Sequence, residues 1–200
     1  MRGTKQIRSA LGIAVIVSTS AVLAAPLTKT LSDAFEKKIV LVQKMAEEES
    51  ATDRPTTFTQ DETNSYLKFG AGGLLPTGLT QPELTMIGQG KVAGKAIVDL
   101  DVVRRKQSSG GWFDPTSYLT GQLPVTASGR IVTWDGKGRF ELDSAEVSGV
   151  PIPKSFLAQM VNFFTRTADN PKGSSIDDTF ELPTKIKRID VESGRFVLHQ

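Results

Sequence analysis

The stretch LPVTASGRIVTWDGKGRFELDSAEVSGVPIPKSFLAQMVNFF, residues 123–164, decides the fold of this chain. Its first part, residues 123–134, alternates apolar and polar side chains with the period of two that a strand with one buried face requires. The sequence DGKG at 135–138 favours the positive φ angles of a tight hairpin turn. A second strand is therefore expected at 139–147, paired antiparallel with the first.

The return strand and the helix that follows it both carry apolar side chains. Phe140 and Leu142 fall on one face of the strand, and a shift in the alternation at Ser144 predicts a bulge. Pro153 fits the first turn of a helix. The apolar residues of that helix recur at helical spacing and are Phe156, Leu157, Met160, Val161 and Phe164. Such a stripe usually packs into a core; its alternative role is to line, with Phe140 and Leu142, a groove that binds a lipid or another apolar ligand.

The same plan extends to the rest of the chain. Apolar side chains at spacings of three and four predict an amphipathic helix at 31–46. A T-x-x-E capping box predicts a second helix at 59–69. Alternating patterns predict further hairpins at 84–103 and 185–198. Helices that alternate with antiparallel hairpins predict an α+β fold, with one antiparallel sheet of about six long strands packed against amphipathic helices.

The N-terminal residues have the features of a secretory signal peptide. Residues 1–25 combine basic residues, an apolar segment and small residues before Ala24. The apolar segment is shorter than the roughly 20 residues that cross a bilayer. We therefore expect cleavage and export to the periplasm or the medium, with an uncleaved inner-membrane anchor as the alternative. The expected division is a signal at 1–25, an amphipathic helix and linker at 27–55 and a single α+β domain at 56–200.

Charge and composition exclude several classes of function. The chain has 24 basic and 22 acidic side chains, and removal of Arg2, Lys5 and Arg8 with the signal leaves 21 basic against 22 acidic. A nucleic-acid partner is therefore not expected. The chain has no cysteine and one histidine, His199, which excludes thiol catalysis and structural zinc. We expect no cofactor.

Two acidic residues are the remaining candidates for catalysis. Asp99 and Asp101 are predicted on one strand face, about 6 to 7 Å apart by the strand rise, which is a separation that acid/base pairs use. Lysines and arginines on the same strand favour an ordinary solvated face instead. A carboxylate-dependent hydrolase is thus the least favoured function.

A basic and aromatic segment is a candidate membrane-surface site. Arg104, Arg105 and Lys106 precede Trp112 and Phe113. A solvated strand end is the usual role of such a charge run. Its alternative role is contact with anionic lipid headgroups, with the two aromatic side chains in the interface.

Two motifs carry a family resemblance. The sequence FTQDETNSYL at 58–67 and the later VSGVPIP at 147–153 resemble small exported bacterial proteins of unassigned activity. The order of elements over residues 57–198 is also similar to that of tubular lipid-binding (TULIP-like) envelope proteins. That resemblance implies long curved strands that wrap a helix and leave an apolar groove, and it transfers no ligand-contacting residue.

The expected function follows from these features together. The strand at 123–134 would span roughly 40 Å at about 3.3 Å per residue, and strands of that length twist and curl. A curled sheet against an apolar helix favours a non-enzymatic exported envelope protein that binds a lipid or another apolar ligand. The alternative is an interaction or scaffold module that docks another envelope protein through residues 31–49 or through an edge hairpin.

Overall fold

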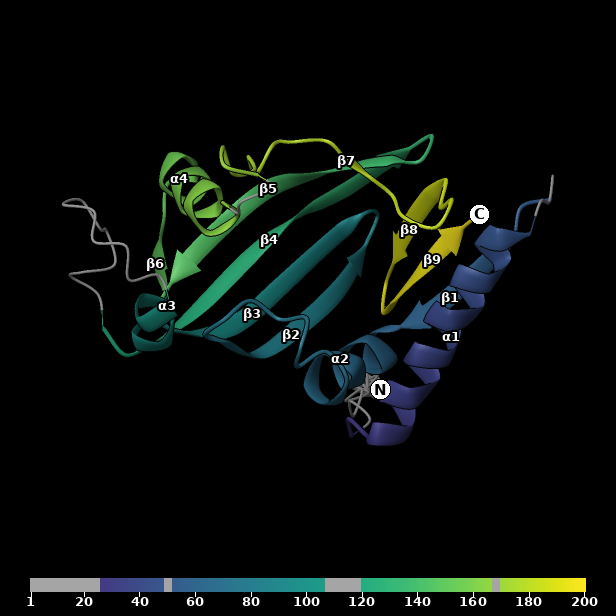
Figure 1. Ribbon diagram of the computed structural model, residues 1–200, viewed down its shortest axis with the longest axis horizontal. Coiled ribbons are helices and arrows are strands. Elements are labelled where there is room, and N and C mark those ends of the chain that lie inside the picture. Colours follow the sequence, from purple (N-terminus) through teal and green to yellow (C-terminus); the bar gives the residue numbers. More distant parts are fainter. Residues whose placement is uncertain (1–25, 49–51, 107–119, 167–169) are drawn as a thin grey trace, which may run out of the picture.

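The computed structural model describes residues 26–48, 52–106, 120–166 and 170–200 and contains two antiparallel sheets (Figure 1). The strands of the larger sheet are β2 (Leu79–Gly88), β3 (Lys91–Asp99), β4 (Gln122–Trp134), β5 (Lys137–Val147), β6 (Val150–Pro151) and β7 (Phe180–Glu181). Those of the smaller sheet are β1 (Pro55–Thr59), β8 (Arg188–Glu192) and β9 (Arg195–His199). The helices are α1 (Lys29–Glu47), α2 (Gln60–Phe69), α3 (Leu100–Lys106) and α4 (Lys154–Phe164). The predicted α+β class with a six-stranded antiparallel sheet is confirmed.

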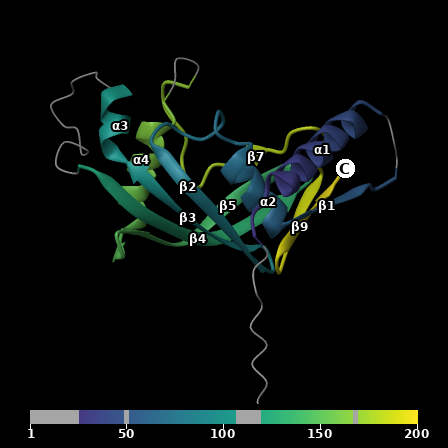
Figure 2. The same cartoon turned by 90° about the horizontal axis from the view of Figure 1, so that it is seen from below.

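The helices lie at the two ends of the larger sheet. In Figure 2, α3 and α4 rise at one end of the strands and α1 and α2 at the other, all on the same side. The strand order of this sheet is β2-β3-β4-β5-β6, and β7 pairs with the beginning of β5. The middle of one sheet face is therefore left between two groups of helices.

The central hairpin forms as its sequence predicts. Strands β4 and β5 pair from Trp134 and Lys137 at the turn to Val125 and Val147 at the far end. The register shifts between Ser128 and Gly129, which places one extra residue of β5 opposite them and confirms the predicted bulge. The hairpin is thus both long and bent.

The last hairpin does not close the larger sheet, contrary to expectation. Strands β8 and β9 instead form the smaller sheet with β1, in the order β1-β9-β8. Strand β1 was not predicted, because Pro55 and the polar residues before it are typical of a linker. Its burial alternates, and Phe58 is completely buried. Strand β1 is a short edge strand, and a proline is tolerated at the first residue of such a strand.

The main core lies between α1 and the smaller sheet. It consists of Phe35, Val42, Phe58, Leu182, Ile186 and Leu198. The ring of Phe58 lies 4.9 Å from that of Phe35 and 4.8 Å from that of Phe196, measured between centroids. These distances are typical of stabilising aromatic pairs. The predicted amphipathic helix at 31–46 is confirmed, and its apolar face packs on this core.

Backbone hydrogen bonds join the smaller sheet to the hairpin tips of the larger one. The Gly90 N–H donates to the Val191 carbonyl at 3.1 Å, and the Ile131 N–H donates to the Gly90 carbonyl at 2.9 Å. The Thr133 hydroxyl donates to the Ile189 carbonyl at 3.1 Å and accepts from its N–H at 3.0 Å. A second cluster of buried residues, Met86, Val92 and Val191, lies at this junction. Strand β8 therefore holds both hairpin tips in place.

The outer edge of β2 is covered by side-chain amides of α2. Asn64 Nδ2 donates to the Leu84 carbonyl at 2.8 Å, and the Leu84 N–H donates to Asn64 Oδ1 at 2.7 Å. Gln60 Oε1 accepts from the Met86 N–H at 2.7 Å. These bonds satisfy edge groups that would otherwise attract another strand.

Helix α2 begins with the predicted capping box. Thr59 Oγ1 accepts from the Glu62 N–H at 3.2 Å, and the Thr59 N–H donates to the Glu62 carboxylate at 2.9 Å. Lys38 of α1 lies 2.7 Å from that carboxylate. Burial opposes the charged form of Glu62, but the bonds from Lys38 and Thr59 outweigh it and hold the pKa of Glu62 below its ordinary value of 4.5.

The signal-peptide prediction falls on residues 1–25, outside the described residues. Within the described ranges, no helix combines the length and the hydrophobicity needed to cross a membrane.

We expect Asn64→Ala to lower the free energy of unfolding by about 2 kcal/mol, because it leaves the Leu84 N–H and carbonyl without their partners. Urea unfolding followed by circular dichroism measures this. The matched control is Gln43→Ala on the exposed side of α1, expected to cost less than about 0.5 kcal/mol. Equal effects of the two substitutions would show that the amide does not support the β2 edge.

We expect Glu62→Gln to cost about 1 kcal/mol at pH 7 and progressively less in acid. A lowered folded-state pKa means that charged Glu62 stabilises the protein above its unfolded-state pKa, and that this contribution disappears as the pH falls through the folded-state value. Urea unfolding at pH 7 and at pH 3.5, with Glu181→Gln as the exposed control, measures the difference. A cost that is the same at both pH values would contradict the assignment.

Candidate functional site

One face of the larger sheet is apolar over most of its length. Strand register places its side chains, because residues paired across neighbouring strands point to the same side. We call the following set the apolar face: Leu84 and Met86 of β2; Val92, Ala96 and Val98 of β3; Leu123, Val125, Ala127 and Ile131 of β4; Phe140, Leu142, Ala145 and Val147 of β5. The alternation of apolar and polar residues along these strands therefore places the apolar side chains on one continuous surface.

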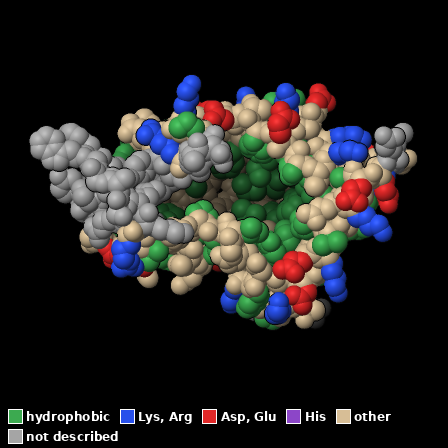
Figure 3. Space-filling view, viewed as in Figure 1, with side chains coloured by type: hydrophobic (Ala, Val, Ile, Leu, Met, Phe, Trp, Pro, Cys, Tyr) green, Lys and Arg blue, Asp and Glu red, His purple; other side chains and the backbone are tan. Residues whose placement is uncertain are grey.

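The apolar face is covered at one end and open in the middle. Met86 and Val92 are only 2% and 7% exposed, because Val191 of β8 packs on them. Further along the face, Val125 and Leu142 are half-buried, while Ala145 between them is 5% exposed. In Figure 3 the centre of the molecule is hollowed, and hydrophobic side chains line the hollow.

A cleft of about 1050 Å³ adjoins this face. It is bounded by Leu27, by the end of α2, by residues 72–78 except Leu74, and by parts of β2, β3 and β4. Ala96 and Val125 belong both to the cleft lining and to the apolar face. The volume is at the upper end of the range for small-molecule sites, about 300–1,000 Å³.

The other face of the sheet is polar. Arg139 pairs with Glu141, and the hydroxyls of Ser128 and Ser144 lie 2.8 Å apart. The ion pair of Lys95 with Glu83, at 2.9 Å, lies at the lining of the cleft. Such pairs are typical of a solvated surface. The contrast between the two faces makes the apolar face and the cleft the candidate site.

The structure places the predicted groove residues at two separate positions. Phe140 packs on the buried cluster beside β8, and Leu142 lies two residues further along β5. Helix α4 follows β6, at the opposite end of β5, where Leu157 and Val161 are half-buried and Phe156 is 37% exposed.

The side chains of Met160 and Phe164 lie outside the described part of the structure. The cleft is lined by residues other than those predicted for the groove. A groove between α4 and the sheet therefore stays a prediction. The sequence signal for the cleft was the Gly- and Pro-rich segment 70–82, which predicts a loop but not the surface that the loop borders.

The candidate membrane-surface segment is largely outside the described residues. Trp112 and Phe113 lie there, as do the side chains of Arg104 and Lys106. The backbone of the basic triplet belongs to α3, so the interpretation of this triplet as a strand end is wrong. The Arg105 side chain is exposed.

The expected pairing of Asp99 and Asp101 on one strand face is also wrong. Strand β3 ends at Asp99, and Asp101 lies in the first turn of α3. Asp99 Oδ1 accepts from the Val102 N–H at 3.0 Å, which caps the helix and holds the pKa of Asp99 below its ordinary value. Asp101 accepts from the Gly121 N–H at 3.2 Å. Both carboxylates therefore hold backbone in place.

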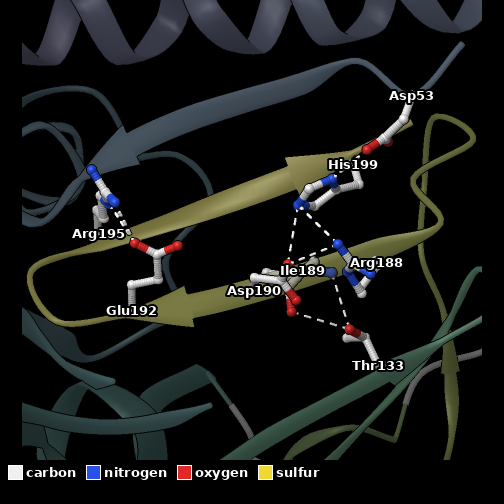
Figure 4. Close-up of polar contacts among 8 residues, drawn as sticks. All are labelled: Asp53, Thr133, Arg188, Ile189, Asp190, Glu192, Arg195 and His199. Atoms are coloured by element: carbon white, nitrogen blue, oxygen red, sulfur yellow. Dashed lines mark hydrogen bonds and ion pairs between the residues drawn. The ribbon is translucent and has the colours of Figure 1, made fainter. Parts of the chain in front are cut away.

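The histidine is held more firmly than its position in the sequence predicts. His199 lies on β9 with a side chain only 15% exposed (Figure 4). Its Nδ1 lies 2.9 Å from Asp53, and its Nε2 lies 3.1 Å from Asp190, which also pairs with Arg188 at 3.0 Å. The hydrogen bond with His199 holds the pKa of Asp53 below its ordinary value.

These contacts tie strands together. Asp53 precedes β1, and Asp190 lies on β8, so His199 joins all three strands of the smaller sheet. The nearby Thr133 hydroxyl is engaged with the backbone of Ile189 (Figure 4). In the described part of the chain, no group of three or more His, Asp or Glu residues is placed to hold a metal ion.

Comparisons with family models, curated proteins and solved structures found no significant match. The functional conclusion rests on the geometry of the chain itself.

Proposed function

We propose that the chain is a non-enzymatic exported envelope protein that binds a lipid or another apolar ligand on the apolar face and in the adjoining cleft. The observation that carries the proposal is the incomplete cover of the apolar face away from β8, where Val125 and Leu142 are half-buried and Val125 also lines a cleft of about 1050 Å³. The resemblance to TULIP-like proteins implies the same class of ligand.

Surface energetics support a ligand at this position. Each Å² of apolar surface removed from water contributes about 25 cal/mol. A continuous apolar patch on a folded protein therefore favours a partner that covers it. The polar opposite face, with its Arg139–Glu141 ion pair and its Ser128–Ser144 hydrogen bond, offers no comparable surface.

The dimensions of the apolar face suit a hydrocarbon chain. From Leu123 to Gly129, short of the end covered by β8, β4 extends about 20 Å at about 3.3 Å per residue. One leaflet of a bilayer is about 15 Å of hydrocarbon, half of the 30 Å core. An acyl chain of ordinary length therefore fits on this face.

The groups that the sequence offers for catalysis have structural roles. Asp99 caps α3, Asp101 binds the Gly121 N–H, and His199 joins the strands of the smaller sheet. These roles support binding over hydrolysis.

The experiment is titration of the protein with cis-parinaric acid, a fluorescent fatty acid, together with native mass spectrometry of protein purified from its own envelope. We expect saturable binding and a co-purified apolar molecule. Val125→Lys should weaken binding at least tenfold, because it places a charge on the apolar face. The control is Ser128→Lys, which lies on the same strand but on the polar face.

Circular dichroism checks that both variants fold. If Val125→Lys does not fold, Val125→Trp replaces it, because this substitution narrows the site without adding a charge. A wild-type protein without saturable binding, or equal effects at positions 125 and 128, would overturn the proposal.

A docking module is the second candidate, and one observation favours it. Val40 and Leu41 on the outer side of α1 are 61% and 48% exposed. Exposed aliphatic pairs on a helix are typical of contacts with another protein. We expect a Val40→Ser, Leu41→Ser double variant to lose an envelope partner in pull-downs while it keeps parinaric acid binding. An unchanged set of captured proteins would exclude docking through this face.

A further inference from the structure

We propose that residues 71–77, which connect α2 to β2, form a lid that closes over the apolar ligand, with Leu74 as the covering side chain. This inference rests on the proposed binding function. We call residues 71–77 the lid segment.

The lid segment is one wall of the cleft. Gly72, Gly73, Leu75 and Pro76 contribute to the lining. The remaining walls are Leu27 before α1, Gly78, the end of α2 and three strands of the sheet. The lid segment is therefore the longest part of the wall that can move without breaking a helix or a sheet.

Both ends of the lid segment are fixed. The N–H groups of Gly70 and Ala71 both donate to the Tyr66 carbonyl at 2.8 Å, and Ala71 is only 2% exposed. At the other end, the Asp99 N–H donates to the Gly78 carbonyl at 2.7 Å. Movement is therefore confined to the residues between these anchors.

The middle of the lid segment is a tight turn with open space around its glycines. The N–H groups of Leu74 and Leu75 both donate to the Ala71 carbonyl, at 2.8 and 3.1 Å, while a Cβ atom at Gly72 or at Gly73 would meet nothing within 4 Å. Glycine also has access to a wider range of φ and ψ than any other residue. When the turn bonds to Ala71 open, the two adjacent glycines before Leu74 can change conformation without a side-chain clash, which suits the hinge of a short lid.

Leu74 provides the driving force for closure. Its side chain is 76% exposed, although leucine is among the residues most often buried. A ligand on the apolar face offers Leu74 an apolar surface, and closure then removes both from water. Because this gain exists only with ligand present, the ligand shifts the lid toward the closed state.

The test uses the absence of cysteine from the chain. Leu74→Cys introduces a single thiol, whose rate of modification by a water-soluble disulfide reagent is measured with and without saturating cis-parinaric acid. We expect parinaric acid to slow modification at least tenfold. The control is Val40→Cys on α1, where the replaced side chain is 61% exposed and modification should proceed at the same rate in both conditions.

A kinetic measurement provides the second readout. Burial of a leucine side chain corresponds to roughly tenfold or more in an equilibrium constant. We therefore expect Leu74→Ser to speed parinaric acid dissociation about tenfold, and Val40→Ser to leave it unchanged.

The two proposals fail in different ways. Saturable parinaric acid binding with no protection of the L74C thiol and no change in dissociation for L74S overturns the lid and leaves the binding function. Absence of saturable binding to the wild-type protein overturns the binding function, and the lid with it.

Discussion

The attachment of strand β8 to two hairpin tips determines the shape of this molecule. A backbone bond from Gly90 to Val191 and the bonds of the Thr133 hydroxyl with the Ile189 backbone hold the β2–β3 and β4–β5 hairpins at one end. The apolar face is therefore covered where β8 sits, and its remaining length extends away from that junction. A sheet with one apolar face must cover that face or bind something to it. In this chain the helices lie at the ends of the larger sheet (Figure 2), and the proposed ligand would cover the part of the apolar face between them.

Local sequence patterns predicted the elements that depend on local physics. The β4–β5 hairpin, the bulge near Ser144 and the capping box at Thr59 each follow from a few adjacent residues. The partner of the last hairpin was not predictable in this way, because β1 carries a linker-like sequence and pairs with a strand far along the chain. To identify β1 as a strand, one must know that Phe58 is buried, and the neighbouring sequence does not show this.

The candidate site was predictable in part. Alternation along β4 and β5 identifies Phe140 and Leu142 as members of an apolar surface. It does not show which end of that surface is open, because burial there depends on Val191 of a different sheet. The errors at Asp99 and Asp101 have a related cause, since the apolar alternation continues past the residue where β3 gives way to α3. A capping carboxylate and a strand carboxylate have the same sequence pattern at that position.

The pairing of β1 with β9 has a consequence for how the protein folds. Thr59 pairs with Arg195, 136 positions later in the chain. The entropy of closing such a loop must be lost before the pairing contributes any stability, and proteins dominated by distant pairings fold slowly. Helix α1 depends on the same event, because its core partners include Leu182, Ile186 and Leu198. Part of its packing is local, because the ring of Phe35 stacks on that of Tyr66 in α2 with centroids 4.6 Å apart. The rest of the apolar side of α1 is covered only when the last strand arrives, late in synthesis.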